Sequence, residues 1–224
     1  MENNTIVIFT SDNGSLGPNP PPIGGSTVAM GGSNGPLRGT KATTWEGGLR
    51  VPGIVSWPGK ISPGRVSREI VTSMDLYPSL AVCCGASVPD DRIIDGRDVT
   101  AIWFDEAAKS PHDAFYYYWM NDLEAIRVGR WKLHFAKRGS AMCELYDLEA
   151  DIAETTDVAS AHPDIVAQLE AQAESARHSL GDARLGRVGT ENRRIGRVPN
   201  PVPLTKFDPD HPYYMAEYDL SDRG

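Results

Sequence analysis

The sequence is poor in three features that would each point to a particular class of protein. Its 224 residues include only three cysteines, of which Cys83 and Cys84 are adjacent and Cys143 is distant. This spacing suits neither a disulfide framework nor a tetrahedral zinc site, so we expect buried free thiols. The longest apolar run, Ile6 to Phe9, is far shorter than the roughly 20 residues of a membrane-spanning helix. Acidic residues outnumber basic ones by 30 to 22, and the formal net charge of −8 argues against a nucleic-acid partner.

The N-terminus also has little that resembles an export signal. Met1 to Asn4 contain no basic residue and lead directly into a strand pattern, so we expect no secretory signal there. The compartment in which the protein works therefore stays open. The chain is long enough, and at 40% hydrophobic content apolar enough, to bury a sizeable core. These properties predict a globular fold with no membrane span.

Two apolar runs near the N-terminus predict strands. Thr5 to Thr10 is an unbroken β-branched and apolar run, which is typical of a strand covered on both faces in a parallel sheet. Val51 to Trp57, closed by Pro58, predicts a second buried strand in the same sheet. Residues 14–36 between them include seven glycines and five prolines, so we expect a long surface loop. Ligands in such α/β sheets lie at the carboxyl ends of the strands.

The pattern changes along the rest of the chain. Asp75 is a candidate N-cap for a short helix that Gly85 would end. Four short strand patterns then predict an antiparallel meander, and they lie at residues 115–119, 125–128, 131–135 and 144–148. His162-Pro163 opens an amphipathic helix that should pack on this meander and end at Gly181. We therefore predict three parts: an α/β core at residues 1–112, a small antiparallel subdomain at 113–181, and an extended irregular tail at 182–224.

Asp12 and Asn13 are the candidate metal ligands. They lie side by side just after the first predicted strand and offer a carboxylate and an amide oxygen, which suit a hard cation such as Ca²⁺. Two residues cannot satisfy the six to eight oxygens that Ca²⁺ takes, so the ligand set in this sequence is incomplete. A tight turn without a metal is the alternative for an Asp-Asn-Gly sequence.

Lys41 is the candidate contact for an anionic substrate. Its ammonium group could approach a sulfate or phosphate oxygen and stabilise the charge that develops as the ester bond breaks. Glycines at 39, 47 and 48 would allow close approach of the backbone, and Glu46 and Arg50 could pair to brace the loop.

The segments around these residues resemble the sulfatase family. Gly35 to Pro52 is similar to the signature in which a lysine lies between an Arg-Gly pair and a Glu-Gly-Gly-Val-Arg-type run. Thr5 to Gly14 resembles the second metal-ligand strand of that family. Three further segments agree in the same order, and the resemblance covers about residues 5 to 180: they are residues 73–80, residues 125–133, and residues 144–149 with 154–156.

This resemblance implies an α/β fold of the alkaline phosphatase type, a bound Ca²⁺ and hydrolysis of sulfate esters. It assigns Asp12 and Asn13 to the metal and Lys41 to the sulfate, both as a substrate contact and in catalysis. The nucleophile of the family is a formylglycine made from a Cys-X-Pro-Ser-Arg motif or its serine variant, and none of the three cysteines begins such a motif. We therefore expect the C-terminal half of a sulfatase, inactive alone.

Two alternatives stay open. The chain could be a non-catalytic truncated product, or a half that works only with a separately encoded N-terminal half carrying the nucleophile. A phosphatase or phosphodiesterase of the same superfold is the other alternative, although such enzymes want histidine-rich zinc sites and no histidine lies near Asp12. Similar sulfatases are often periplasmic, secreted or lysosomal.

Overall fold

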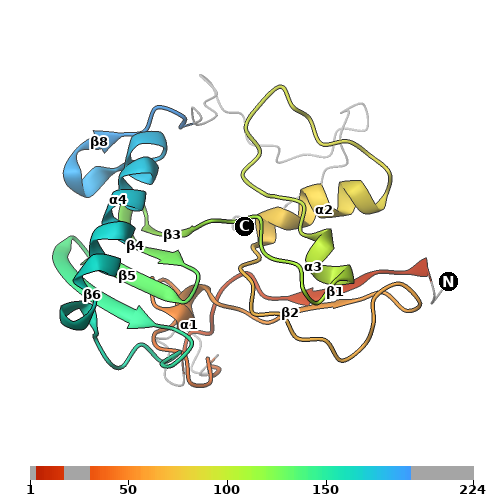
Figure 1. Cartoon of the computed structure of the whole chain (residues 1–224), viewed down its shortest axis with the longest axis horizontal. Helices are drawn as coiled ribbons and strands as arrows, with labels where there is room; N and C mark the ends of the chain where they lie inside the picture. The colour runs from red at the N-terminus through yellow and green to blue at the C-terminus, as the bar shows by residue number, and fades with distance from the viewer. Residues whose placement is uncertain (1–3, 18–30, 193–224) are drawn as a thin grey trace, which may run out of the picture. The chain divides into compact units, whose positions relative to one another are not determined.

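The longest elements of the chain form a four-stranded antiparallel sheet with one long helix against it (Figure 1). The structure is a computed structural model that describes residues 4–17 and 31–192. The strands follow the chain order and confirm the predicted meander, although β4 to β6 begin or end a few residues beyond the predicted limits. They are β3 (Phe115–Trp119), β4 (Asp122–Val128), β5 (Trp131–Lys137) and β6 (Ser140–Asp147).

Tight turns join these strands, and their backbone geometry explains the short connections. Met120, Gly129 and Arg138 each have a positive φ, at 54°, 55° and 49°. Left-handed residues in two-residue loops match the twist of antiparallel strands, so successive strands stay paired. The sheet therefore folds from contacts that are close in the sequence.

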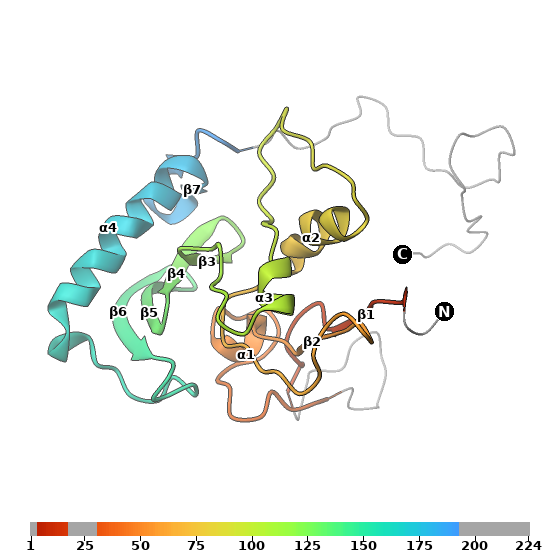
Figure 2. The same ribbon diagram turned by 45° about the vertical axis from the view of Figure 1, so that its right-hand side comes forward.

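Helix α4 (Pro163–Ser179) packs on one face of this sheet, as its apolar spacing predicts. Pro163 lies at the first helical position, where a missing N–H costs nothing, and the left-handed Gly181 follows the helix end. The fully buried core consists of sheet and helix residues together: Leu123, Ile126, Leu133, Phe135, Leu145, Leu169, Ala173 and Ala176. Figure 2 shows the sheet between α4 on one side and the segment that carries α1 (Glu46–Leu49) on the other.

The first two strands differ from the prediction. β1 (Val7–Thr10) and β2 (Gly53–Ser56) are antiparallel to each other and form a sheet of two strands within the described residues. The prediction of buried strands in a parallel sheet is therefore wrong for this chain, because most residues of β1 and β2 are exposed. An unbroken apolar run predicts that both faces of a strand are buried. It does not identify the segment that covers them or the direction in which the strands pair.

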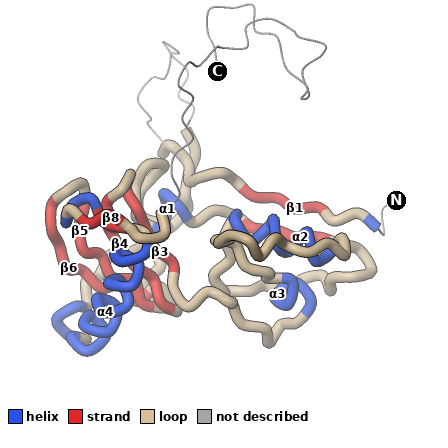
Figure 3. The backbone as a smooth tube through the Cα atoms, turned by 90° about the horizontal axis from the view of Figure 1, so that it is seen from above, coloured by secondary structure: helices blue, strands red, loops and turns tan. Residues whose placement is uncertain are grey.

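A second, smaller core lies beside β1 and β2. Val99, Ile102 and Trp103 are buried in it, and Ile6 and Val55 pack against it from the two strands. Helices α2 (Leu76–Cys83) and α3 (Thr100–Phe104) contribute to this core. Figure 1 shows both helices on the same side of the β1–β2 pair, and Figure 3 gives the view from above, with α2 and α3 labelled beside β1.

The predicted helix start is confirmed, since α2 begins at Leu76 with Asp75 at its N-cap position, but the Asp75 side chain makes no capping hydrogen bond to α2. The 3₁₀ helix η2 (Ser73–Asp75) precedes α2, and the Asp75 carboxylate accepts the N–H of Thr72 at 2.7 Å. Asp75 therefore closes a capping box with Thr72 instead of capping α2. The predicted stop at Gly85 is confirmed, since this residue has a φ of 71°.

Two further expectations need correction. Cys84 and Cys143 are exposed, so the prediction of buried thiols fails for them, while Cys83 is half-buried. The predicted irregular tail at residues 182–224 begins with short structure after α4: β7 (Gly181–Asp182), η4 (Ala183–Leu185) and β8 (Arg187–Val188). Another short element, η3 (Ala159–Ala161), precedes α4. Residues 193–224 of that tail lie outside the described residues, and the division at residues 112 and 181 stays a prediction.

Within the described ranges, no helix is long and apolar enough to cross a membrane. The described chain thus combines helices with antiparallel sheets in an α/β arrangement.

Candidate functional site

Asp12 and Asn13 lie directly after β1, where the strand gives way to a turn. Asp12 is exposed and Asn13 is half-buried. The Ser11 hydroxyl donates to the Asn13 carbonyl at 2.9 Å and more weakly to the Asp12 carboxylate at 3.4 Å. This local bonding holds the turn and leaves the Asp12 carboxylate open to solvent.

Two backbone hydrogen bonds join this turn to the loop that carries Lys41. The N–H of Lys41 donates to the carbonyl of Ser15 at 2.9 Å, and the N–H of Gly14 donates to the carbonyl of Gly48 at 3.0 Å. Ser15 is three residues from Asp12, so their Cα atoms lie within roughly 11 Å of each other. The two predicted elements of the site, far apart in sequence, therefore meet in the structure.

Asn34 ties the same two segments together from a third. Its side-chain oxygen accepts the N–H of Ser15 at 2.7 Å, and its amide donates to the Gly39 carbonyl at 2.9 Å. Asn34 was not singled out from the sequence, because an asparagine in a Gly-rich loop is typical of any turn. It acts here as a bridge between the strand end and the lysine loop.

Glycine is required where these segments cross. A Cβ on Gly14 would lie 1.7 Å from the carbonyl oxygen of Gly47, and a Cβ on Gly48 would lie 2.1 Å from that of Thr43. Neither distance is compatible with a side chain, so the close approach of the backbones depends on these glycines. Their role in backbone approach, expected from the sequence for Gly47 and Gly48, also extends to Gly14.

The Lys41 side chain is exposed, and the backbone beside it is held in an uncommon conformation. Ala42 has a φ of 66°, in the left-handed region that side chains disfavour. The Arg138 guanidinium, from the turn between β5 and β6, donates to the Ala42 carbonyl at 2.8 Å. Thr43 closes the turn by donating its hydroxyl to the Thr40 carbonyl at 2.7 Å. The structure thus fixes the backbone on both sides of Lys41.

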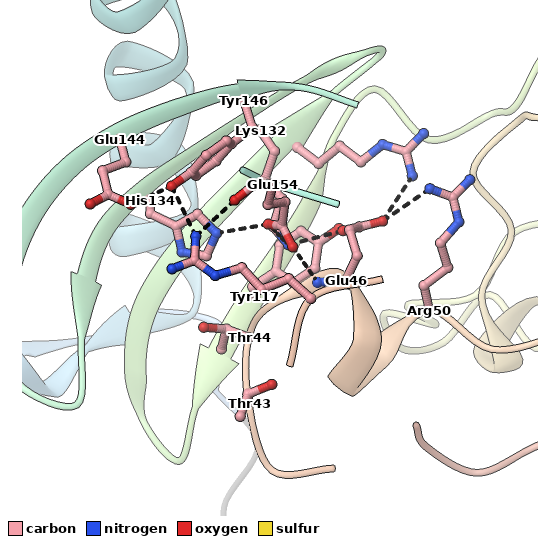
Figure 4. A network of polar contacts seen from close by, with 12 residues as sticks. Thr43, Thr44, Glu46, Arg50, Tyr117, Lys132, His134, Glu144, Tyr146 and Glu154 are labelled. Carbon is pink, nitrogen blue, oxygen red and sulfur yellow. Dashed lines mark hydrogen bonds and ion pairs between the residues drawn. The ribbon is translucent and has the colours of Figure 1, made fainter. Parts of the chain in front are cut away.

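Glu46, a buried carboxylate at the start of α1, anchors the loop that carries Lys41 (Figure 4). The predicted pairing with Arg50 is present at 3.1 Å. Glu46 also accepts hydrogen bonds from the Tyr117 hydroxyl at 2.7 Å and from the Lys132 ammonium at 2.9 Å. Burial raises the pKa of Glu46, but Lys132 and Tyr117 outweigh it and lower this pKa to about 2. Glu46 is therefore ionised at neutral pH.

A second buried carboxylate, Glu154, completes the network. It lies 2.8 Å from the Lys132 ammonium and accepts the backbone N–H of Glu46 at 2.7 Å. His134, also fully buried, contacts it at 3.2 Å. Burial lowers the pKa of His134 to about 4, although the hydrogen bond to Glu154 opposes this shift. Lys132 therefore lies between the carboxylates of Glu46 and Glu154, at the centre of a buried ion cluster.

Trp45 and its neighbours bind the loop to the sheet. The Trp45 ring lies between two cations, with the Arg38 guanidinium 3.6 Å and the Lys137 ammonium 3.9 Å from its centroid. Thr44 is buried and exchanges short hydrogen bonds with Glu124 and Lys137, at 2.5 and 2.6 Å. Burial lowers the pKa of Lys137 to about 8, against the opposing effect of Glu124.

The sequence did not reveal this network. His134 was set aside because strand alternation explains it, and Lys132, Glu124 and Glu154 drew no prediction. The available signal was that residues 132 and 134 share one face of β5, yet a polar face of a strand usually indicates solvent. Here the lysine loop covers that face.

The predicted metal ligands, Asp12 and Asn13, fit a cation only in part. Asp12 and Asn13 supply hard oxygen atoms, but no group of three or more His, Cys, Asp or Glu residues that could hold a metal occurs among residues 4–17 and 31–192. The structure places the Lys41 ammonium group and the oxygen atoms of Asp12 and Asn13 on two loops that backbone hydrogen bonds join.

Two family models match the chain. The Sulfatase model matches residues 1–86, and a model described as the C-terminal region of aryl-sulfatase matches residues 110–195. Steryl-sulfatase of Rattus norvegicus is 43% identical over 138 residues, covering 60% of this chain and 22% of that protein. Arylsulfatase of Hemicentrotus pulcherrimus is 42% identical over 149 residues, covering 66% of this chain and 25% of that protein.

Longer alignments give the same result at lower identity. Human arylsulfatase A is 34% identical over 197 residues, covering 74% of this chain and 36% of that protein. Among solved structures, the PsFucS1 sulfatase from Pseudoalteromonas sp. superposes with a TM-score of 0.67 at 27% identity. That superposition covers 87% of this chain and 39% of the other. The chain thus spans about a quarter to two fifths of the length of the proteins that it matches.

Proposed function

Because this chain belongs to the sulfatase family, we propose that it supplies the substrate lysine and two metal ligands of a sulfuric ester hydrolase. Lys41 would bind an oxygen of the sulfate group, and Asp12 and Asn13 would bind a Ca²⁺ ion. The backbone hydrogen bonds that join Ser15 to Lys41 and Gly14 to Gly48 carry this proposal, since they bring the two sets of residues to one place.

Lys41 would act by charge. Lys41 is exposed, its N–H donates to Ser15, and Arg138 donates to the neighbouring Ala42 carbonyl, so its ammonium group could neutralise the negative charge that develops as the ester bond breaks. The ion would polarise the sulfate, and a formylglycine hydrate would supply the nucleophile. The 224 residues contain no Cys-X-Pro-Ser-Arg motif, so the nucleophile would come from residues outside this sequence.

The experiment combines this chain with a polypeptide that carries the nucleophile. We suggest co-expression with the part of Hemicentrotus pulcherrimus arylsulfatase that lies outside its matched region, followed by assays on an aryl sulfate and the matching aryl phosphate. We expect metal-dependent hydrolysis of the sulfate ester by the combination and none by this chain alone. Hydrolysis of the phosphate ester alone would favour a phosphatase and contradict the proposal.

Lys41→Ala should slow sulfate release by about 10²-fold or more in the active combination, because the variant loses a preorganised charge at the reacting group. Lys109→Ala is the matched control, since Lys109 is exposed and pairs with Glu69 away from the site. An equal effect of both variants would remove Lys41 from the mechanism.

A further inference from the structure

Two left-handed residues that are not glycine meet beside Lys41. Ala42, the next residue in the chain, has a φ of 66°, and Arg138, in the turn between β5 and β6, has a φ of 49°. The Arg138 guanidinium donates to the Ala42 carbonyl at 2.8 Å, across 96 residues of sequence. Within the described part of the chain only four residues other than glycine have a positive φ, and this one hydrogen bond joins two of them.

The left-handed conformation has a different cause at each position. Arg138 precedes Gly139 in a two-residue connection between β5 and β6, where left-handed residues match the twist of the strands. Ala42 lies in a turn closed by the hydrogen bond from the Thr43 N–H to the Thr40 carbonyl at 3.1 Å. A positive φ at the third position of such a turn favours glycine or asparagine, because a Cβ disfavours it. A conformation of this kind persists where the surrounding structure holds it.

The β5–β6 turn is well placed to hold Ala42. The Arg138 guanidinium lies 3.5 Å from the centroid of the Trp119 ring, and this stacking orients the group before it bonds to the loop. The buried Glu124 carboxylate accepts the Arg138 N–H and the Thr44 hydroxyl, each at 2.5 Å. The turn and the loop of Lys41 are therefore joined at two points, one on each side of Thr43.

These contacts bear on the direction of the Lys41 side chain. The N–H of Lys41 donates to the Ser15 carbonyl at 2.9 Å, which fixes the peptide group before the lysine. Arg138 fixes the peptide group after Ala42. The direction of a Cα–Cβ bond follows from the backbone on both sides of it. If Ala42 left the left-handed conformation, the Lys41 ammonium group would therefore point elsewhere.

Resting on the proposed function, we propose that Arg138 is a positioning residue for Lys41. It holds Ala42 in the left-handed conformation and so directs the lysine toward the sulfate group. The small antiparallel sheet thereby contributes to the site through the turn between β5 and β6, without contact with the substrate.

Arg138→Asn tests the first step of this proposal. The variant loses the guanidinium but keeps the turn, because Asn-Gly is a preferred pair in two-residue connections. In the full chain we expect the Lys41 and Thr43 amides to exchange about 10-fold faster or more, measured by hydrogen exchange. In the active combination with the arylsulfatase segment, kcat for an aryl sulfate should fall about 10-fold with a smaller change in KM.

Ala42→Gly tests whether Arg138 acts through Ala42. Glycine adopts a positive φ without the penalty of a Cβ, so the conformation no longer has to be held. Adding Ala42→Gly to Arg138→Asn should therefore restore most of the lost kcat, and the two substitutions should be non-additive in a double-mutant cycle. A role of Arg138 in stability alone would not be relieved by a change at Ala42.

Arg130→Asn is the matched control. Arg130 also lies in a tight turn, with its guanidinium 5.6 Å from the centroid of the Trp131 ring, but at the opposite end of β5. It should leave the exchange of the Lys41 amide and kcat at their wild-type values.

Two results would overturn the proposal. One is unchanged exchange of the Lys41 and Thr43 amides in Arg138→Asn. The other is a loss of activity that Ala42→Gly fails to restore, and a raised KM in that case would show that Arg138 contacts the substrate itself. The exchange measurement needs no catalysis, so an inactive wild-type combination would count against the proposed function, while the exchange rates would still decide whether Arg138 holds the loop.

Discussion

Lys132 lies at the centre of the buried polar network that anchors the loop of Lys41. It is fully buried, and its ammonium group lies 2.9 Å from Glu46 and 2.8 Å from Glu154. Removing one member of a buried ion cluster leaves the charges of the other members unpaired. The resulting loss of stability is larger than any stability that the intact cluster adds relative to apolar packing. Stability therefore depends on the whole set being present.

Lys132→Met should lower the free energy of unfolding by about 3 to 5 kcal/mol, because two buried carboxylates would lose their shared cation. Urea unfolding followed by circular dichroism measures the change. The same substitution at Lys109, whose side chain is 83% exposed, is the control and should have a far smaller effect. Similar losses at both positions would contradict a special role of the buried cluster.

His134 makes the stability depend on pH. Burial lowers its pKa in the folded protein to about 4, below its ordinary value of 6.5. Between these values the unfolded chain binds the proton more readily, so the contribution is complete above pH 6.5 and is lost as the pH falls to about 4. The loss should amount to at most about 3 kcal/mol.

His134→Gln should flatten the dependence of unfolding free energy on pH in that window, as measured by urea titrations at several pH values. His178, whose side chain is exposed on α4, provides the matched control His178→Gln. If the wild-type slope persists in His134→Gln, the buried imidazole is not its cause.

At the scale of elements, the site depends on how closely two loops approach. Gly14→Ala would place a methyl group against the Gly47 carbonyl, 1.7 Å away, so the strand end and the lysine loop have to separate. We expect faster hydrogen exchange at the Lys41 amide, which bonds to Ser15, together with loss of activity in the combined enzyme.

Gly53→Ala is the control for this prediction, because a Cβ at Gly53 in β2 would meet nothing within 4 Å. Its Lys41 amide should exchange at the wild-type rate. Unchanged exchange in Gly14→Ala would show that the loops tolerate separation and that their contact does not hold Lys41.

The elements that could be predicted are those whose partners are near in sequence. The meander and α4 follow from alternation and from apolar spacing of three and four, since each strand pairs with the next one. β1 and β2 pair across more than forty residues, and nothing in Thr5 to Thr10 states the direction of that pairing. The positions of β1 and β2 could therefore be predicted from the sequence, but their antiparallel pairing could not.

The site was predictable to a similar degree. Asp12, Asn13 and Lys41 stand in recognisable motifs, and the structure brings their loops together. Lys132 carries no local signal, because a charged residue on one face of a strand predicts solvent unless the covering loop is known. Glu154 lies in the loop after β6, where a glutamate is equally expected to face solvent. The residues that hold the two loops of the site in place can be identified only from the tertiary packing.

At the scale of the whole described chain, the two cores differ in size, and we expect them to differ in stability. The core between the meander and α4 contains eight buried apolar residues, whereas the core beside β1 and β2 contains three. Regions with few buried apolar contacts open at lower free energy than the rest of a protein. Amides of β1 and β2 should therefore exchange faster than those of β4 and β5.

Native-state hydrogen exchange with mass spectrometry would measure this difference on the isolated chain. We expect sub-global opening of β1 and β2, with β4 and β5 exchanging only on global unfolding. Phe9→Ser should leave this order unchanged because Phe9 is exposed, whereas Trp103→Ala, in the small core, should increase the exchange of β1 and β2 selectively. Equal protection of all four strands would show that the small core is as stable as the large one.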